Sequence, residues 1–588
     1  MRSTFMGLEA NKRGLFTQQS ALYTTGHNIA NANTEGYSRQ RVNMSPTLGY
    51  PGAGLNAPMT AGYIGTGVKT DSVQRIRDEF IDRQYRQETN KLGYWESKAS
   101  AINQMEDIMS EPSEYGLDEA FRMFWSALQD VGANPEDTAA RKAAVQRAIH
   151  LADSFNYIDT QLKQIQGNLG NEIKVSVEQI NSLLQQIADL NRQIQAVEPN
   201  GYVPNDLYDK RDVLVDELNE YIPVSIQRVP SGGNASEVAE GSYTITFKPV
   251  GKEPIILVHG REFAQLSALG TKKVTDPNDS NSTIPKTIDG NDTSNLLSHL
   301  KIEWAGSWPN VPTNGDGDPD FNQYNPKEIN LNVNGKLPAL NGDDINQFDF
   351  EPSKGKLLSL IDSYGYIGTT RDVEGYYPQM IEQLDKLAEV FASAFNEQHR
   401  KGFTLEPSKQ GTFLQGTFFF LGEDEALAND YPGKITAASI KVNDKIIDNP
   451  SLVAASTVQG EEGNGNNALK LSNLHSESVA NVKVIVDNNG TIEIELSDLE
   501  GATFQSFYQG LIGQLGVDGQ KATLLQKNTE TIRLTVENNR ASMSSVSLDE
   551  EMTDMIRFQQ AYNANARMIT VIDETLDKII NGMGRVGL

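Results

Sequence analysis

The residues of this chain that could do chemistry are six histidines, a short run of aspartates and a group of carboxylates beside an arginine. No histidine has a second histidine or a carboxylate at metal-ligand spacing on one helix face, so the pattern does not predict a zinc site. The chain has no cysteine, which excludes disulfides, thiolate nucleophiles and cysteine-ligated zinc. The histidines are His27, His150, His259, His299, His399 and His475.

The aspartate run resembles the first half of a calcium-binding loop. Asp316, Asp318 and Asp320 alternate as such a loop requires. Phe321 stands where the loop needs glycine, and Lys327 stands where it needs a bidentate glutamate. These two departures favour a solvated acidic turn over a calcium site.

The carboxylate group lies in the segment NDLYDKRDVLVDEL, residues 205–218. Here Asn205, Asp209, Arg211 and Asp212 could pair a carboxylate with a guanidinium, and a structural ion pair is favoured over a general acid. No HExxH, GxSxG or P-loop pattern occurs in the chain. Three glycines lack the flanking strand and helix of a phosphate loop and are predicted to form turns: Gly62, Gly65 and Gly67. The sequence therefore predicts no enzyme, cofactor or metal site.

The segment GHNIANANTEGYSRQ, residues 26–40, is crowded with asparagines but contains no pairing of a nucleophile with a base. Asn31 and Asn33 suit the end of a helix. The four residues from Asn33 to Gly36 suit a tight turn, with glycine at the position that needs a positive φ. Tyr37 then leads away in extended form. We interpret this segment as a corner between two layers of the molecule.

Length and charge limit what kind of molecule this is. The chain has 588 residues, enough for about three or four domains, and its formal net charge is −27. A charge of this sign repels nucleic acid and anionic membranes. Residues 1–16 lack the apolar core of a signal peptide, and no apolar run approaches the roughly 18 residues of a membrane span. We expect no nucleic-acid partner and no membrane insertion, and an exported protein of this kind would need a route without a cleavable signal.

Both ends of the chain carry helix patterns with a seven-residue apolar repeat. The first helix is predicted from Thr4 to Asn31, and the last is predicted to begin with a capping box at Ser547–Glu550. In the last helix, Gln559 interrupts the weaker apolar positions that lie halfway between members of the repeat. The first repeat consists of Leu8, Leu15, Leu22 and Ile29, and the last consists of Leu548, Met555, Tyr562, Ile569, Leu576 and Met583.

Each terminal repeat is too narrow to hold a lone helix. Burying six large apolar side chains stabilises a helix by roughly 10–18 kcal/mol. Ordering about thirty residues costs roughly 1–2 kcal/mol per residue in backbone entropy. Each helix therefore needs a partner, either the opposite terminus or a neighbouring subunit. Residues 1–50 are net basic and residues 545–588 are net acidic, which suits two ends that meet.

The middle of the chain combines long helices with short strands, so we predict an α+β multidomain fold. The terminal helices pair as an α-helical coiled-coil stalk, a long-helix bundle domain follows, and β-rich domains are inserted in the middle. Ile173, Ile180, Ile187 and Ile194 predict a buried bundle face. Helices are predicted over 73–109, 136–197, 377–400 and 519–540, and strands over 224–229, 243–250, 254–258, 440–442, 482–486 and 491–496.

The predicted domains follow from this pattern. They are 1–70 plus 545–588 for the terminal α-helical inner domain, 71–204 plus 365–403 plus 502–544 for the helical bundle, 205–364 for the inserted β-rich outer domain and 404–501 for a smaller mixed α/β module.

The two ends resemble the terminal signatures of the flagellar axial rod and hook protein family of bacteria. The N-terminal signature is SALYTTGHNIANANTEGYSR, and the C-terminal one is VSLDEEMTDMIRFQQAYNANARMITVIDETLDKIING, with its core at Gln559, Tyr562 and Ala564. Family members at the hook–filament junction share further features with this chain: Ser38-Arg39-Gln40, the segment 205–218 and FNEQHRKGF at 395–403. Glu35 stands where relatives often have proline, and residues 235–345 lie outside the resemblance.

The resemblance implies a structural protein of the extracellular flagellum, exported unfolded by the flagellar type III apparatus. It implies a ring of identical subunits between hook and filament, with the terminal helices as the innermost layer. The implied partners are the hook protein, the second junction protein or filament, and an export chaperone at the C-terminal region. Assembly would then depend on the terminal repeats and the turn: Leu8, Leu15, Leu22, Ile29, Asn31, Asn33, Gly36, Tyr37, Leu548, Met555, Gln559, Tyr562, Ile569 and Leu576.

Two alternatives remain open from the sequence. A hook or distal rod protein shares the terminal motifs, although the segments 205–218 and 395–403 and the long helix at 136–197 favour a junction protein. A surface adhesin or enzyme carried on the flagellum would lie in residues 235–345, where no catalytic constellation is present.

Overall fold

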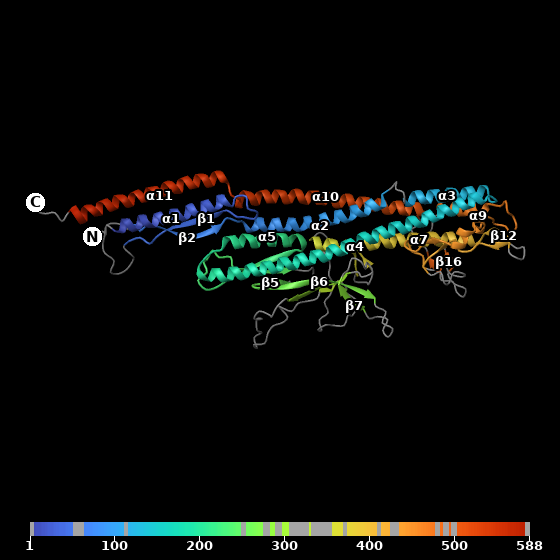
Figure 1. Ribbon diagram of the computed structural model, residues 1–588, viewed down its shortest axis with the longest axis horizontal. Helices are drawn as coiled ribbons and strands as arrows, with labels where there is room; N and C mark the ends of the chain where they lie inside the picture. Colours follow the sequence, from blue (N-terminus) through green and yellow to red (C-terminus); the bar gives the residue numbers. More distant parts are fainter. Residues whose placement is uncertain are drawn as a thin grey trace, which may run out of the picture.

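The molecule is elongated, and the first and last helices of the chain lie together at one end of it (Figure 1). No described helix is long and apolar enough to cross a membrane. The aspartate run at 316–320, Gly62 and Met583 lie outside the described residues. The computed structural model describes residues 5–50, 64–110, 116–247, 255–273, 283–287, 297–304, 329–330, 355–367, 373–407, 413–423, 434–476, 483–485, 493–495 and 502–582.

The stalk is the antiparallel pair of α1 (Phe5–Ala30) and α11 (Leu548–Asp577), and a π-helical turn (Lys578–Gly582) extends α11. Both helices lie within a few residues of their predicted bounds. Ser547 precedes α11 as predicted, but the predicted capping box is wrong, because the Ser547 side chain makes no capping hydrogen bond. The Glu550 carboxylate instead accepts a hydrogen bond from Arg39.

A two-stranded antiparallel ribbon, β1 (Gln40–Pro46) and β2 (Val68–Arg75), follows α1 and packs on it. Gly67 enters β2 with φ 118°, the turn predicted there, and lies against the Ala10 carbonyl of α1. The ribbon itself was not predicted, and β2 crosses the expected domain boundary at residue 70.

The bundle consists of long helices that run along the molecule (Figure 1). α2 (Glu79–Met109) packs along α10 (Phe504–Ser544), and α4 (Thr138–Val197) packs against α3 (Leu117–Ala133) and α7 (Tyr376–Arg400). The prediction of a buried bundle face on α4 is confirmed, because four isoleucines at seven-residue spacing are fully buried: Ile173, Ile180, Ile187 and Ile194.

α10 begins at residue 504 rather than at the predicted 519. Thr503 and Ser506 form a capping box that starts the helix before a glycine-rich stretch. Gly519 then brings the helix close to Ile102 of α2. The face of α10 that packs on α2 repeats every seven residues: Tyr508, Leu515, Ala522, Thr529 and Val536.

Aromatic rings fill the bundle core at the end of the molecule away from the stalk. Phe121 of α3 and Phe391 of α7 meet edge to face, with ring centroids 5.1 Å apart. Phe504, at the start of α10, packs on both rings. Fully burying one such side chain stabilises the fold by about 1.5–3 kcal/mol, so this cluster fastens three helices from distant parts of the sequence.

Two helices that the predicted boundaries place beside the strands pack on bundle helices instead. α5 (Asn205–Tyr221) and α6 (Lys356–Tyr364) pack on α2 and α4, whereas the predicted boundaries placed both in the β-rich domain. Gly93 of α2 permits close contact with α5, because a Cβ there would lie 2.6 Å from a backbone carbonyl. We therefore move these two helices to the bundle.

One mixed sheet forms the outer domain, and α4 covers part of it. The Asn181 amide of α4 exchanges two hydrogen bonds with the Leu266 backbone. The strand order is β11-β10-β8-β6-β5-β4-β3, with β7 beside β6 and β9 beside β8. β3, β4 and β5 match the strands predicted at 224–229, 243–250 and 254–258 to within a few residues. The strands are β3 (Val224–Val229), β4 (Ser242–Phe247), β5 (Ile255–His259), β6 (Glu262–Lys273), β7 (Thr283–Thr287), β8 (Leu297–Trp304), β9 (Ile329–Asn330), β10 (Tyr366–Ile367) and β11 (Val373–Glu374).

The smaller module is held by the end of α7, in the segment 395–403 that the sequence singled out. The Asn396 side chain accepts the backbone N–H groups of Phe419 and Phe420 and donates to the Phe420 carbonyl. Its elements are β12 (Phe403–Pro407), β13 (Phe413–Gln415), β14 (Phe420–Leu421), β15 (Lys441–Val442), α8 (Asp444–Asp448), α9 (Asn466–Asn473), β16 (Lys483–Ile485) and β17 (Glu493–Glu495).

Candidate assembly site

The seam of the stalk is lined on the α1 side by small residues, one position ahead of the predicted repeat. Gly7 faces Ile572, and a Cβ at Gly14 would lie only 3.0 Å from the Asn565 side chain. Ala21, the next member of this repeat, is buried. Small side chains let the two helices approach closely, so the seam is narrow and buries little apolar surface.

The predicted apolar repeats flank this seam. All of α11 is described, and its one buried residue is a carboxylate, Glu551. Leu8, Leu15, Leu22, Ile29, Met555, Tyr562, Ile569 and Leu576 are half-buried, whereas Leu548 and Gln559 are exposed.

The other faces of both stalk helices expose large apolar side chains. Tyr23 of α1 is 72% exposed and Met552 of α11 is 57% exposed. Exposed apolar surface of this extent marks a site of protein contact. We call this set the outer apolar surface, and its members are Phe5, Phe16, Tyr23, Leu548, Met552, Ile556, Met568, Val571, Ile579 and Ile580.

The asparagine-rich turn ends α1 as the sequence predicted. Gly36 has φ 74°, and a side chain there would collide with Val213 of α5. The Asn31 side chain donates to a carbonyl one turn back in α1 and accepts from the Thr34 hydroxyl. Asn33 is exposed. The turn therefore seats the end of α1 on α5.

Asn28, which the sequence did not predict as a site residue, contacts more of the corner than Asn31 or Asn33 does. Its amide oxygen accepts from the Gln40 backbone N–H (3.0 Å) and the Tyr37 hydroxyl (2.9 Å). Its amide nitrogen donates to the Gln40 carbonyl (2.9 Å) and to the Glu551 carboxylate (3.1 Å). One side chain thus joins the end of α1, the start of β1 and the start of α11.

Arg39 links the same three elements to the end of α10. Its backbone N–H donates to the carbonyl of Ser544, the last residue of α10 (2.8 Å). Its guanidinium donates to Glu551 (2.6 Å) and Glu550 (2.7 Å). Burial alone would lower the Arg39 pKa, but the hydrogen bond and charge of Glu551 raise it above its ordinary value. The basic N-terminal region and the acidic C-terminal region meet here.

Below this corner, arginines from β2 and α2 surround carboxylates of α5. Arg75 is 3% exposed and contacts Asp209 (2.7 Å), Asp212 (2.8 Å) and Glu240 (2.6 Å). The predicted ion pair involving Asp209 and Asp212 is present, but its arginines come from β2, from the connection after it and from α2 rather than from Arg211. We call the group the arginine cluster: Arg75, Arg77, Arg86 and Arg540 with Asp82, Asp209, Asp212, Asp216 and Glu240.

Asp212 lies at the centre of the arginine cluster. Burial raises the pKa of this carboxyl, but the charges of Arg75, Arg77 and Arg86 outweigh that effect and hold the pKa well below its usual range. The Tyr243 hydroxyl of β4 donates to the same carboxylate (3.1 Å). Asp212 is therefore a fixed anion that ties the ribbon, the bundle and the outer sheet together.

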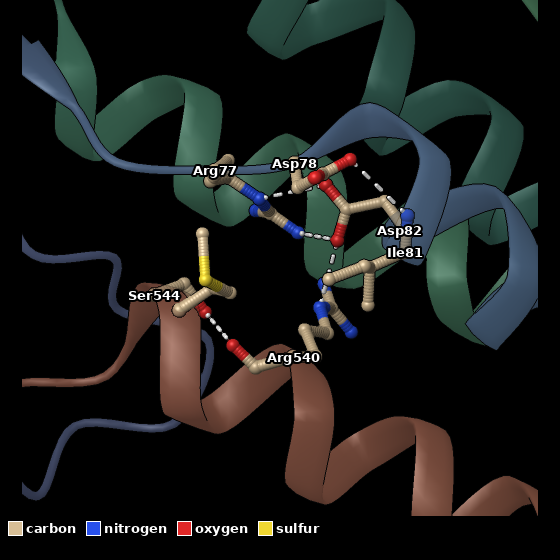
Figure 2. Close-up of a pocket in the computed structure, with 7 residues that line it drawn as sticks. Arg77, Asp78, Ile81, Asp82, Arg540 and Ser544 are labelled. Carbon is tan, nitrogen blue, oxygen red and sulfur yellow. Dashed lines mark hydrogen bonds and ion pairs between the residues drawn. The ribbon is translucent and has the colours of Figure 1, made fainter.

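A shallow hollow lies beside the cluster at the end of α10 (Figure 2). Arg77 and Arg540 both reach the Asp82 carboxylate there, so its charges are already paired. The empty volume of the hollow is about 160 Å³ including open solvent. Sites that bind small molecules have volumes of roughly 300–1,000 Å³, so this hollow is smaller than such a site. Within the described residues, no group of three or more histidine, aspartate or glutamate side chains is placed to hold a metal ion. The arrangement suits a structural joint.

Comparison with known proteins decides the family. Residues 102–300 and 319–418 match the model described as the flagellar hook-associated protein FlgK helical domain. Flagellar hook-associated protein 1 of Bacillus subtilis (strain 168) is 39% identical over 584 residues, which cover 99% of each chain. The chain belongs to the flagellar hook-associated protein 1 family. It is a structural component of the bacterial flagellum, which confirms the resemblance seen in the sequence.

More distant relatives agree along the whole length. Flagellar hook-associated protein 1 of Salmonella typhimurium (strain LT2) is 26% identical over 588 residues, covering 97% of this chain and 98% of that one. A solved structure, the flagellar hook junction protein FlgK from Burkholderia pseudomallei, has a TM-score of 0.50 at 15% identity and covers 79% of this chain and 100% of its own. This likeness shows a shared multidomain α+β fold.

Both ends of the chain also match models of the wider axial family. Residues 8–37 match the flagella basal body rod protein model, and residues 538–582 match the flagellar basal body rod FlgEFG protein C-terminal model. These two segments contain most of α1 and all of α11, and the hydrogen bond from Asn28 to Glu551 joins them. The part of the chain shared with the other axial proteins is therefore the stalk with its corner.

Proposed function

We propose that this chain is an adaptor at the junction between hook and filament, where identical subunits form a ring through their stalks. The outer apolar surface supports this proposal most directly. A thirty-residue helix whose one buried residue is Glu551 gains too little from its own chain to offset the entropy of ordering it. Neighbouring subunits, covering residues such as Met552 and Ile556, would supply the missing burial.

The proposed location is the extracellular flagellum, reached through the flagellar type III apparatus. The proposed partners are the hook protein on one side, the second junction protein or the filament on the other, and an export chaperone at the C-terminal region. Family membership and the hook-junction title of the Burkholderia structure support the location. The arginine cluster supports an adaptor role, because it holds the ribbon next to the stalk, the bundle and the outer sheet in one fixed arrangement.

The test introduces charge into the outer apolar surface without disturbing the fold. The double substitution Met552→Lys with Ile556→Lys changes side chains that are more than half exposed, so we expect the unfolding midpoint of the purified chain to change little. We expect the variant to be exported but absent from flagella sheared from cells, with filaments no longer attached. The matched control is Val175→Lys on α4, an apolar residue 62% exposed and remote from the stalk, which should be incorporated normally. Normal incorporation of the double variant would overturn the proposal.

A further inference from the structure

The seam between α1 and α11 contains one fully buried polar layer. Asn28 is 1% exposed and Glu551 is 2% exposed. Asn28 donates to Glu551 (3.1 Å), and Glu551 also accepts from Arg39 (2.6 Å), so the Glu551 carboxylate is satisfied by residues that precede β1. A buried carboxylate or amide without its partner is strongly disfavoured, so this layer tolerates only one arrangement.

The rest of the seam does not discriminate between registers. Gly7 faces Ile572 and Gly14 faces Asn565. Because the helices are antiparallel, moving seven residues forward along α1 corresponds to moving seven residues backward along α11. The same register places Phe558 opposite Ala21. A slip of one heptad would again set a small residue of α1 against a large one of α11.

The connection between α10 and α11 sets only a coarse limit on the register, of about one heptad. It has three residues, 545–547, which span up to about 10 Å when extended, close to the roughly 10.5 Å rise of one heptad. Asn28, in contrast, cannot follow a slipped α11. Its amide is held by both backbone groups of Gln40 and by the Tyr37 hydroxyl.

We propose that Asn28, through Glu551, is the positioning residue that sets the register of α11 against α1. A buried polar pair in an otherwise permissive helix seam specifies alignment more than it adds stability. The register fixes the height at which Met552 and Ile556 leave the stalk, so every subunit presents the same outer surface. That consequence for assembly rests on the proposed function, whereas the register itself does not.

Disulfide trapping tests the register, because the chain has no cysteine of its own. The in-register reporter is the full-length chain with Gly14→Cys and Asn565→Cys, and the reporter of a one-heptad slip is Gly14→Cys with Phe558→Cys. Both are oxidised briefly as the purified chain, in which the stalk forms only transiently, and in flagella sheared from cells, in which we expect neighbouring subunits to order it. With Asn28 and Glu551 intact, we expect in-register bonds to exceed slipped ones by about tenfold or more, the discrimination that one hydrogen bond to a charged group supplies.

A second set of variants removes the hydrogen bond between Asn28 and Glu551 without adding a buried charge. Asn28→Leu with Glu551→Leu should bring the ratio of in-register to slipped bonds to within about twofold, and it should also lower the stability of the corner, because the Gln40 backbone loses its side-chain partner. Glu551→Gln keeps an acceptor for Asn28 and should retain most of the preference. Asn33→Leu, an exposed asparagine in the same turn, is the matched control and should leave the ratio unchanged.

Each outcome bears on the proposal. Equal trapping of both reporters in the unaltered background would show that no register is selected and would overturn it. A double-leucine variant that is less stable but keeps its preference would show that Asn28 only stabilises the seam, which also overturns it. If the double-leucine variant lost its preference for the in-register disulfide but still entered flagella normally, Asn28 would set the register, and only the link between register and assembly would be contradicted. Failure of the lysine variants of the outer surface to block incorporation is a separate result, which would count against the proposed function alone.

Discussion

At the residue scale, one of the histidines that look reactive in the sequence is held by hydrogen bonds that use both of its ring nitrogens. His399 at the end of α7 is fully buried. Its Nδ1 donates to the Thr417 carbonyl (2.7 Å), and its Nε2 accepts the Ala454 N–H (2.9 Å). Burial lowers its pKa to about 4. A second proton would have to displace the Ala454 N–H, so this imidazole is a neutral connector between α7 and the smaller module.

The pKa of His399 predicts a specific loss of stability in mild acid. Between about pH 6.5 and pH 4 the unfolded chain binds a proton at this residue and the folded chain does not, so the free energy of unfolding falls as the pH falls. The full loss is on the order of 3 kcal/mol. Urea unfolding from pH 7.5 to pH 4.5 should show wild type approaching the less stable His399→Gln variant as the pH falls. Parallel curves for the two proteins would contradict this assignment.

The arginine cluster makes a second prediction at the same scale. Asp212→Asn leaves Arg75, Arg77 and Arg86 around a neutral amide, and removing one member of a buried ion pair costs about 3–5 kcal/mol. We expect a loss of that size in urea unfolding. Asp189→Asn removes a carboxylate from an exposed pair on α4 and should cost less than about 1 kcal/mol. Equal effects of the two substitutions would show that burial of the cluster contributes nothing.

The sequence could indicate that Asp209 and Asp212 form ion pairs, but not with which arginines. Arg75 belongs to β2, which pairs with β1 across a connection of more than twenty residues. Strand pairing of this kind has no local signature, and both strands are polar on their exposed side. Asn28 was visible as part of an asparagine cluster, yet its partners Gln40 and Glu551 come from two other elements.

At the element scale, the sequence located the terminal helices but misjudged which face of α1 meets α11. The leucine repeat is the stronger apolar signal, so it predicted the contact face. The closest approach instead uses Gly7, Gly14 and Ala21, whose small size favours contact without raising hydrophobicity. Amphipathic periodicity shows where large apolar side chains lie. It does not detect a helix contact formed by small residues that let the two backbones approach closely.

The narrow seam predicts different effects for two glycines of the same helix. Gly14→Leu would force a side chain against Asn565 and separate the stalk helices, whereas Gly26 has open space around it. Gly26→Leu should leave pairing intact and stabilise α1 by up to about 1 kcal/mol through helix propensity. We expect only the Gly14 variant to lose incorporation into flagella. Equal incorporation of both variants would mean that the closeness of the seam is unimportant.

At the scale of the whole molecule, the pattern of long helices around a β-rich insertion was predictable, but domain membership was not. α5 and α6 border the insertion in sequence and were grouped with it, yet they fill the bundle. Short helices carry no mark of which core they enter, since α6 is buried on nearly all sides: Leu357, Leu358, Leu360, Ile361 and Tyr364.

The uneven burial of the molecule predicts uneven protection from hydrogen exchange. α11 buries one residue, whereas α4 has a continuous buried face including Ile173, Ile180 and Ile187. In the isolated chain we expect amides of α1 and α11 to exchange within seconds to minutes while those of α4 remain protected far longer. In assembled flagella the stalk amides should become protected. Strong protection of α11 in the isolated chain would remove the need for neighbouring subunits.

The hydrogen bond from Asn28 to Glu551 joins residues 523 positions apart. During synthesis or threading from the N-terminus, α1 emerges first and has no partner until nearly the entire chain has followed. A chain cut short by a stalled ribosome or a protease before Glu551 could still fold its bundle, but it could not close this contact. Joining the first helix to the last therefore makes closure of the stalk depend on nearly the complete chain, and a truncated copy would lack this contact.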